Sequence, residues 1–163
     1  IIDAASINPA GAVTGSYVDS AGVLRGYLRH PDGTFVTFDA PGALATFPHA
    51  INPDGVIAGR FLTSLSSPVR SFVRAPDGSI TTYDAPGAVH GTFAASINPA
   101  GSIAGWYTDA GHRSHGFVRS PEGVLTNVDI PGAISVAAAS INPGGWVTGS
   151  YWDGATTRGF IFR

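Results

Sequence analysis

Three residues of this 163-residue chain have types and predicted positions that suit acid–base chemistry. The register of a predicted hairpin places His115 opposite Asp129, and a neighbouring carboxylate can orient an imidazole as a general base. The adjacent hydroxyl, Ser114, lies on the opposite strand face and so is not an evident nucleophile. His49 is the third candidate, because it replaces an alanine found in three related segments. The simpler alternative is that His115 and Asp129 form a pair that only stabilises the hairpin, because the other segments carry arginine at the position of His115.

A second candidate site is suited to ligand binding. All three tryptophans lie in the last two of four related segments, and their strand parity puts them on the same side of their respective sheets. Indole faces stack on sugar rings and other planar ligands, and a nearby arginine adds charge. The candidate residues are Trp106, Trp146, Trp152, Arg60 and His49. Packing between neighbouring sheets is the alternative role for these aromatic side chains.

The sequence predicts no metal site and no cofactor. It contains no Cys, which excludes disulfides, thiolate metal sites and cysteine nucleophiles. It also has no phosphate loop, zinc-protease motif or EF-hand. Four asparagines that each precede a proline could ring a channel mouth and hold a cation or water, or cap the turns in which they occur. They are Asn8, Asn52, Asn98 and Asn142.

The composition is typical of a globular domain with little net charge. Hydrophobic residues make up 44% of the chain and charged residues 12%, which favours a packed core over disorder. The net charge of −2 argues against nucleic acid or an anionic membrane as partner. No apolar run approaches the roughly 20 residues of a membrane span. Because the first residues, Ile1-Ile2-Asp3, do not form a leader, we expect a processed protein or a piece of a longer chain.

An internal repeat determines the elements that must position these side chains. The triplet Ile-Asn-Pro occurs at residues 7–9, 51–53, 97–99 and 141–143, so the spacings are 44, 46 and 44 residues. Such a period, with Gly-rich turns and short strands, is typical of propeller blades. We therefore predict a single all-β domain, a four-bladed β-propeller. The blades are expected at about 1–45, 46–91, 92–135 and 136–163.

Each repeat divides into four predicted strands, which in the first copy are 5–7, 13–17, 25–29 and 35–39. The second strand alternates a branched residue, a glycine and an aromatic residue on one face, and a glycine there indicates close approach of a neighbouring backbone or ring. A Pro-Asp-Gly turn joins strands three and four and predicts a three-residue loop with a bulge. That register places Arg25 opposite Asp39 and Arg70 opposite Asp84.

The fourth copy ends after its third strand. Ile1-Ile2-Asp3 could supply a fourth strand, but three residues span at most about 10 Å, which is too short for a crossing between blades. We therefore assign these residues to the start of the first strand, and expect the last blade to be three-stranded or completed by another chain. A closed ring of four blades is expected. A partial ring completed by oligomerisation and an open solenoid-like array are the alternatives, and the protein would be a monomer or a homodimer.

The stretch GWYTDAGHRSHGFVRSPEGVLTNVDIPGA resembles the extracellular HAF repeat of secreted bacterial proteins, whose pattern covers essentially the whole chain in four copies. The resemblance implies a secreted, extracellular protein and assigns no activity. The histidine of the family pattern occurs once, as His115, and arginine stands there in the other copies. From the residues and the resemblance we expect a non-catalytic module that binds a carbohydrate or a protein, or that acts as a scaffold. The alternative is a small hydrolase or lyase at the channel mouth.

Overall fold

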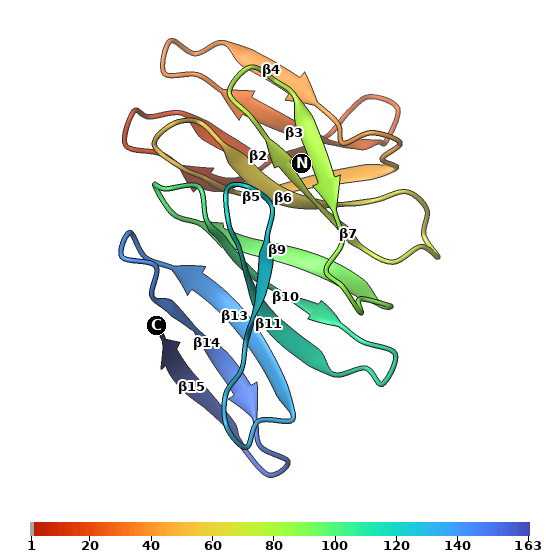
Figure 1. The fold of residues 1–163 in the computed structure, drawn as a ribbon. Coiled ribbons are helices and arrows are strands. Elements are labelled where there is room, and N and C mark those ends of the chain that lie inside the picture. The colour runs from red at the N-terminus through yellow and green to blue at the C-terminus, as the bar shows by residue number, and fades with distance from the viewer. Residues whose placement is uncertain (1) are drawn as a thin grey trace.

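The computed structural model describes residues 2–163, and every regular element in this range is a β-strand. The strands form four consecutive antiparallel meanders, here called units 1 to 4, which follow one another from red to blue in Figure 1. Unit 1 contains β1 (Ile2–Ile7), β2 (Val13–Val18), β3 (Leu24–Arg29) and β4 (Phe35–Phe38). Unit 2 contains β5 (Ala45–Ile51), β6 (Ile57–Leu62), β7 (Arg70–Arg74) and β8 (Ile80–Tyr83).

The two remaining units repeat this order, with one strand fewer in the last. Unit 3 contains β9 (Gly91–Ile97), β10 (Ile103–Thr108), β11 (Ser114–Arg119) and β12 (Leu125–Val128). Unit 4 contains β13 (Ser135–Ile141), β14 (Val147–Trp152) and β15 (Thr157–Phe162). The last unit has three strands within this chain, and β1 includes Ile2 and Asp3, as assigned from the sequence, while Ile1 lies outside the described residues. No helix in the described part of the chain is long and apolar enough to cross a membrane.

The turns explain why each repeat folds as a meander. Between β1 and β2 the Gly11 N–H donates to the Asn8 carbonyl over 2.9 Å, and Gly11 has a φ of +84°, a conformation that glycine adopts at little cost. Between β3 and β4 the His30 N–H donates to the Thr34 carbonyl over 2.8 Å. The three-residue loop predicted from the sequence is therefore confirmed. Its register pairs Gly26 with Phe38.

Glycine in the second strand of each unit allows the closest packing within a sheet. A Cβ atom placed on Gly59 would lie 2.4 Å from the Phe47 carbonyl oxygen and 2.6 Å from the Phe72 ring. Real Cβ atoms do not approach other heavy atoms so closely. The close approach that the sequence predicted at this position is thus present.

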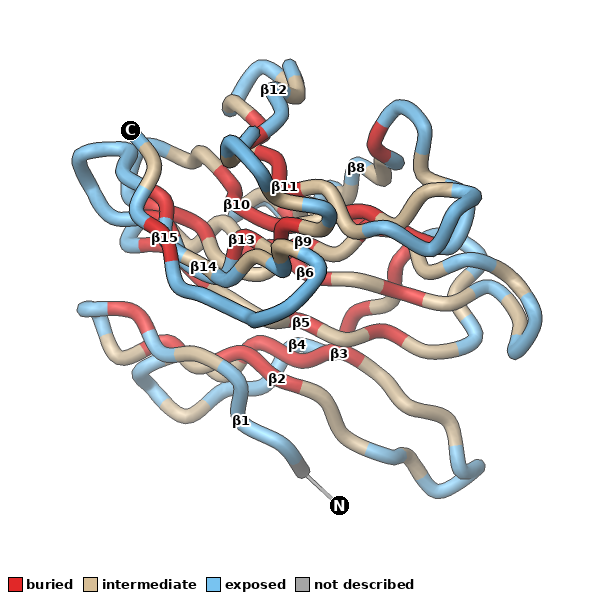
Figure 2. Tube along the Cα trace, turned by 90° about the horizontal axis from the view of Figure 1, so that it is seen from below, coloured by how far each residue is buried: buried red, intermediate tan, exposed pale blue. Residues whose placement is uncertain are grey.

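The hydrophobic core consists of the joints between consecutive units. In the first joint, Leu28 and Phe38 of unit 1 pack with Ile51, Ile57 and Phe72 of unit 2. Equivalent clusters occupy the joints between units 2 and 3 and between units 3 and 4. Figure 2 shows the buried residues concentrated in the strands and the exposed ones in the turns. Each unit is therefore stabilised mainly by its neighbours, as in other repeat folds.

The closed ring expected from the sequence is not formed within this chain. Extensive contacts join β5 to unit 1, β9 to unit 2 and β13 to unit 3, but among the described residues no contact of similar extent joins unit 4 to unit 1. Figure 1 shows units 1 and 4 at opposite ends of the array. The open end is seen at Ile7, which is 67% exposed, whereas the equivalent Ile51 is buried against the preceding unit and is 7% exposed.

Candidate functional site

A row of three aromatic rings and one guanidinium runs across units 2 and 3. Phe47 and Arg60 are cross-strand partners on β5 and β6, and Phe93 and Trp106 are the equivalent partners on β9 and β10. The Arg60 Cζ atom lies 5.4 Å from the Phe47 ring centroid and 5.7 Å from that of Phe93. Phe93 in turn stacks on Trp106, with ring centroids 5.3 Å apart and planes 10° apart. We call these four residues the aromatic ladder.

The aromatic ladder occupies one repeat position at which the units differ. The equivalent cross-strand pair is Asp3 with Ser16 in unit 1 and Ala137 with Ser150 in unit 4. Large side chains are therefore confined to the two middle units and are flanked by small or acidic residues. All four ladder side chains are half-buried, so part of each remains accessible to a ligand.

The charge in the aromatic ladder is not neutralised by the protein. Partial burial lowers the pKa of Arg60 below its usual value, although a guanidinium stays protonated at any physiological pH. No carboxylate in residues 2–163 forms an ion pair with Arg60, and no hydrogen bond engages its guanidinium in that range. The ladder thus presents a cation between two π faces, with its N–H donors free for a ligand.

His49 lies beside this charge. It is the extra residue of a β-bulge between Pro48 and Ala50, in the strand that also carries Phe47. Burial is the main cause that lowers its pKa, and the positive charge of Arg60 lowers it further, against a smaller opposite effect of Asp3. His49 is therefore a neutral donor and acceptor next to the aromatic ladder at neutral pH.

The structure does not bring the three tryptophans together. Trp106 belongs to the aromatic ladder, whereas Trp146 directly precedes β14 and Trp152 ends it, about 20 Å apart along the chain. Trp146 is 42% exposed and packs against the Arg163 guanidinium, whose Cζ atom lies 5.2 Å from the centroid of the indole ring. Trp152 is 44% exposed, in a shallow depression between β13 and β14. Of the predicted ligand-binding residues, the structure therefore groups Trp106, Arg60 and His49.

The histidine–carboxylate pair is present with a different partner from the one expected. The His115 Nε2 atom lies 2.9 Å from the Asp109 Oδ2 atom, and the ring stacks on Tyr107 at 4.9 Å. Asp129, the carboxylate expected opposite His115, does not bond to it. Asp109 lies in the turn before β11, where it also accepts main-chain N–H bonds from Gly111 and Arg113. The His115 hydrogen bond and these N–H bonds lower the pKa of Asp109 to about 2.

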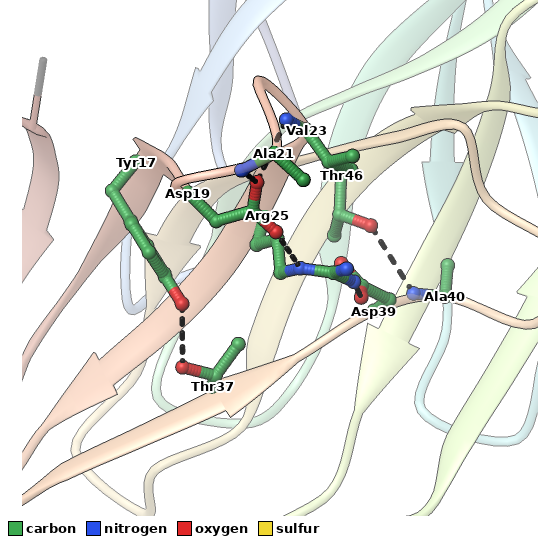
Figure 3. Close-up of polar contacts among 9 residues, drawn as sticks. All are labelled: Tyr17, Asp19, Ala21, Val23, Arg25, Thr37, Asp39, Ala40 and Thr46. Carbon is green, nitrogen blue, oxygen red and sulfur yellow. Dashed lines mark hydrogen bonds and ion pairs between the residues drawn. The ribbon is translucent and has the colours of Figure 1, made fainter.

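The same turn carboxylate occurs in unit 1, where an arginine replaces the histidine. Figure 3 shows Arg25 between Asp19 and Asp39, with its Nε atom 2.7 Å from the Asp19 Oδ2 atom. The Asp19 Oδ1 atom accepts the Val23 N–H over 2.9 Å. The predicted pairing of Arg25 with Asp39 is confirmed, but a strand-register argument could not identify Asp19, because it acts from a turn. In unit 1 this contact joins a turn to a strand. The His115–Asp109 pair makes the same contact in unit 3, so a structural role for it is as well supported as a catalytic one.

Three of the four asparagines donate a side-chain hydrogen bond to the next unit. Asn8 Nδ2 donates to the Asn52 carbonyl over 3.2 Å, Asn52 to Asn98 over 3.4 Å, and Asn98 to Asn142 over 3.3 Å. Each Oδ1 atom accepts the main-chain N–H four residues later, so the asparagines also cap their turns. No group of His, Asp or Glu side chains in the described residues is arranged to hold a metal ion.

Comparison with known proteins identifies the fold type. No family model and no curated protein matches this chain. Among solved structures, TolB from Acinetobacter baumannii is 15% identical with a TM-score of 0.69, over 98% of this chain and 40% of TolB. A streptogramin B lyase is 14% identical with a TM-score of 0.55, over 99% of this chain and 54% of the lyase.

A third similar structure is a catalytically inactive virginiamycin B lyase from Staphylococcus aureus with quinupristin. It is 16% identical, with a TM-score of 0.52, over 90% of this chain and 55% of the lyase. All three are propeller proteins, so the likeness shows a fold of the β-propeller type. This chain spans about half or less of the length of each of them.

Proposed function

We propose that this chain is a secreted, non-catalytic binding module built from four propeller blades, and that its ligand is a glycan carrying carboxylate groups. The observation that supports this most directly is the aromatic ladder, in which Arg60 lies between two phenyl rings without an acidic partner in residues 2–163. The other non-catalytic roles for this module are binding of a protein partner and a purely structural role.

The chemistry of the aromatic ladder favours a ring with an anionic substituent. The C–H face of a sugar stacks on an indole, and Trp106 offers a half-buried indole next to Phe93. A planar guanidinium binds a carboxylate through two parallel N–H bonds, and Arg60 has those donors free. His49 adds a neutral donor or acceptor for a hydroxyl group. Uronic acids combine both requirements in one residue.

A glycan array tests the proposal. We expect wild-type protein to retain uronic-acid glycans, and both Trp106→Ala and Arg60→Gln to weaken that binding at least tenfold, about 1.4 kcal/mol. Trp152→Ala is the matched control, because Trp152 lies outside the aromatic ladder and should bind like wild type. Binding that is lost in Trp152→Ala but kept in Trp106→Ala would contradict the assigned site. No binding to any glycan would favour a protein partner.

A small lyase or hydrolase is the second candidate, and one observation favours it. The His115 Nε2 atom lies 2.9 Å from the Asp109 carboxylate, and such a carboxylate can orient an imidazole for general-base catalysis. Incubation with quinupristin, the ligand of one structural relative, gives a direct test by mass spectrometry. Turnover that disappears in His115→Ala would establish an enzyme and overturn the non-catalytic proposal.

A further inference from the structure

The two ends of the array expose the two halves of a contact that the chain makes three times internally. In each internal joint, the face of one unit receives a branched residue from the first strand of the next unit. Within residues 2–163, nothing covers the receiving face of unit 4, and the inserting strand of unit 1 packs against no preceding unit. We propose that a second copy of this chain fills the gap, with its unit 1 docked on unit 4 of the first copy.

The apolar part of the contact is complementary. At the first joint Leu28 of β3 is 5% exposed because Ile51 of the next unit covers it. The equivalent of Leu28 in unit 4 is Ile161, which is 73% exposed, and the equivalent of Ile51 in unit 1 is Ile7, which is 67% exposed. Large exposed aliphatic side chains of this kind mark an interaction surface when they are adjacent to a groove. Trp146 and Thr148 line such a groove beside Ile161.

The polar part of the contact is complementary as well. Asn8, Asn52 and Asn98 are buried and donate to the next unit, whereas Asn142 is exposed and its Nδ2 atom has no acceptor in residues 2–163. In each internal joint the acceptor is the carbonyl oxygen of the equivalent asparagine in the next unit. For Asn142, the equivalent acceptor is the Asn8 carbonyl oxygen in unit 1 of a second copy.

A serine repeats the pattern. Ser6 Oγ accepts the Ile51 N–H over 3.3 Å, and Ser96 Oγ accepts the Ile141 N–H over 3.4 Å. Ser140 occupies the same position in unit 4 and is exposed. Its repeat-related donor is the N–H of Ile7, so a docked unit 1 would satisfy the serine and the asparagine together. A partner of unrelated sequence would have no reason to match this set.

Because the two surfaces differ, the proposed association is heterologous and joins the head of one copy to the tail of another. Two substitutions block one surface each: Ile7→Arg blocks the head and Ile161→Arg blocks the tail. Both side chains are exposed in the single chain, so neither change disturbs its core. Leu65→Arg is the matched control, because Leu65 is 92% exposed in the loop between β6 and β7, away from both ends.

Sedimentation velocity at about 1 to 100 µM measures the outcome. We expect wild type and Leu65→Arg to form species of at least twice the 16.7 kDa chain mass, and each blocked variant to remain a monomer with an unchanged circular dichroism spectrum. A mixture of the two blocked variants should form a 1:1 complex, because one supplies a free head and the other a free tail. A wild-type monomer at every concentration, or blocked variants that do not pair when mixed, would overturn the proposal.

Discussion

Asn52 donates a hydrogen bond from its Nδ2 atom to the main-chain carbonyl oxygen of Asn98, 46 residues later and in the next unit. The same carboxamide accepts the Val56 N–H through its Oδ1 atom over 2.9 Å. One side chain therefore closes a turn and joins two units at once. Asn52 is 2% exposed, so its carboxamide is largely shielded from water.

Replacing Asn52 by alanine should destabilise the fold by about 1–3 kcal/mol, because the Val56 N–H and the Asn98 carbonyl lose their partner in a buried place. Asn142→Ala is the matched comparison, since its carboxamide is exposed and bonds only within its turn, and should cost about 1 kcal/mol or less. Urea denaturation of both variants in the Ile161→Arg background, which keeps the chain monomeric, measures the difference. Equal losses would show that the bond between units contributes nothing.

Gly105→Ala should lower the free energy of unfolding by about 3 kcal/mol, because the new Cβ atom would lie 2.1 Å from the Phe93 carbonyl oxygen and the sheet must shift. Gly159→Ala is the matched control on the unit 4 sheet, where the nearest atom is 3.8 Å away. It should change stability by less than about 0.5 kcal/mol. Thermal unfolding followed by circular dichroism compares the two. A Gly105→Ala variant as stable as wild type would contradict the packing described for β9 and β10.

The Asp109 carboxyl should titrate at about pH 2 in the folded protein, below its ordinary 3.8. Because the folded-state pKa is depressed, the stabilisation from Asp109 is present above pH 3.8 and is lost as the pH falls through about 2. His115→Ala removes the main cause and should raise the pKa of Asp109. Carboxyl ¹³C NMR titration of both proteins measures it. An unchanged Asp109 titration in His115→Ala would contradict the pair.

His49 should make the protein less stable as the pH falls below its unfolded-state value of about 6.5. Its folded-state pKa is lowered, so the unfolded chain binds the proton first, and stability declines until the pH reaches the folded-state value. His49→Ala, which introduces the residue found in the other three units, should remove this dependence. Stability measured by urea denaturation at pH 5 and pH 8 tests it, and an identical pH dependence in both proteins would contradict the half-buried position of His49 beside Arg60.

The sequence predicted the local structure well because turns and strand alternation are local properties. Asn-Pro-x-Gly and Pro-Asp-Gly fix the hairpin loops, and those loops fix the register that pairs Arg25 with Asp39. The prediction that Asn8 and its equivalents cap their turns is confirmed for the same reason.

Contacts between units could not be predicted, because they depend on how one sheet is rotated onto the next. Nothing in the sequence shows that Arg60 reaches Phe93 or that Asn8 reaches Asn52. The pairing of Gly116 with Val128 agrees with the register that places His115 opposite Asp129, but the imidazole bonds to Asp109, a turn residue that strand register cannot identify. One signal in the sequence does indicate the aromatic ladder: Phe47 and Phe93 occupy the same repeat position, where the other units carry Asp3 and Ala137.

The most direct test of the proposed ligand site is an NMR titration that follows the three indole N–H signals, each assigned by a Trp→Phe variant. A uronic-acid oligosaccharide should shift the Trp106 signal in a saturable manner and leave those of Trp146 and Trp152 in place. Arg60→Gln should weaken the response at least tenfold. Saturable shifts at Trp146 or Trp152 with none at Trp106 would contradict the claim that the aromatic ladder is the binding surface.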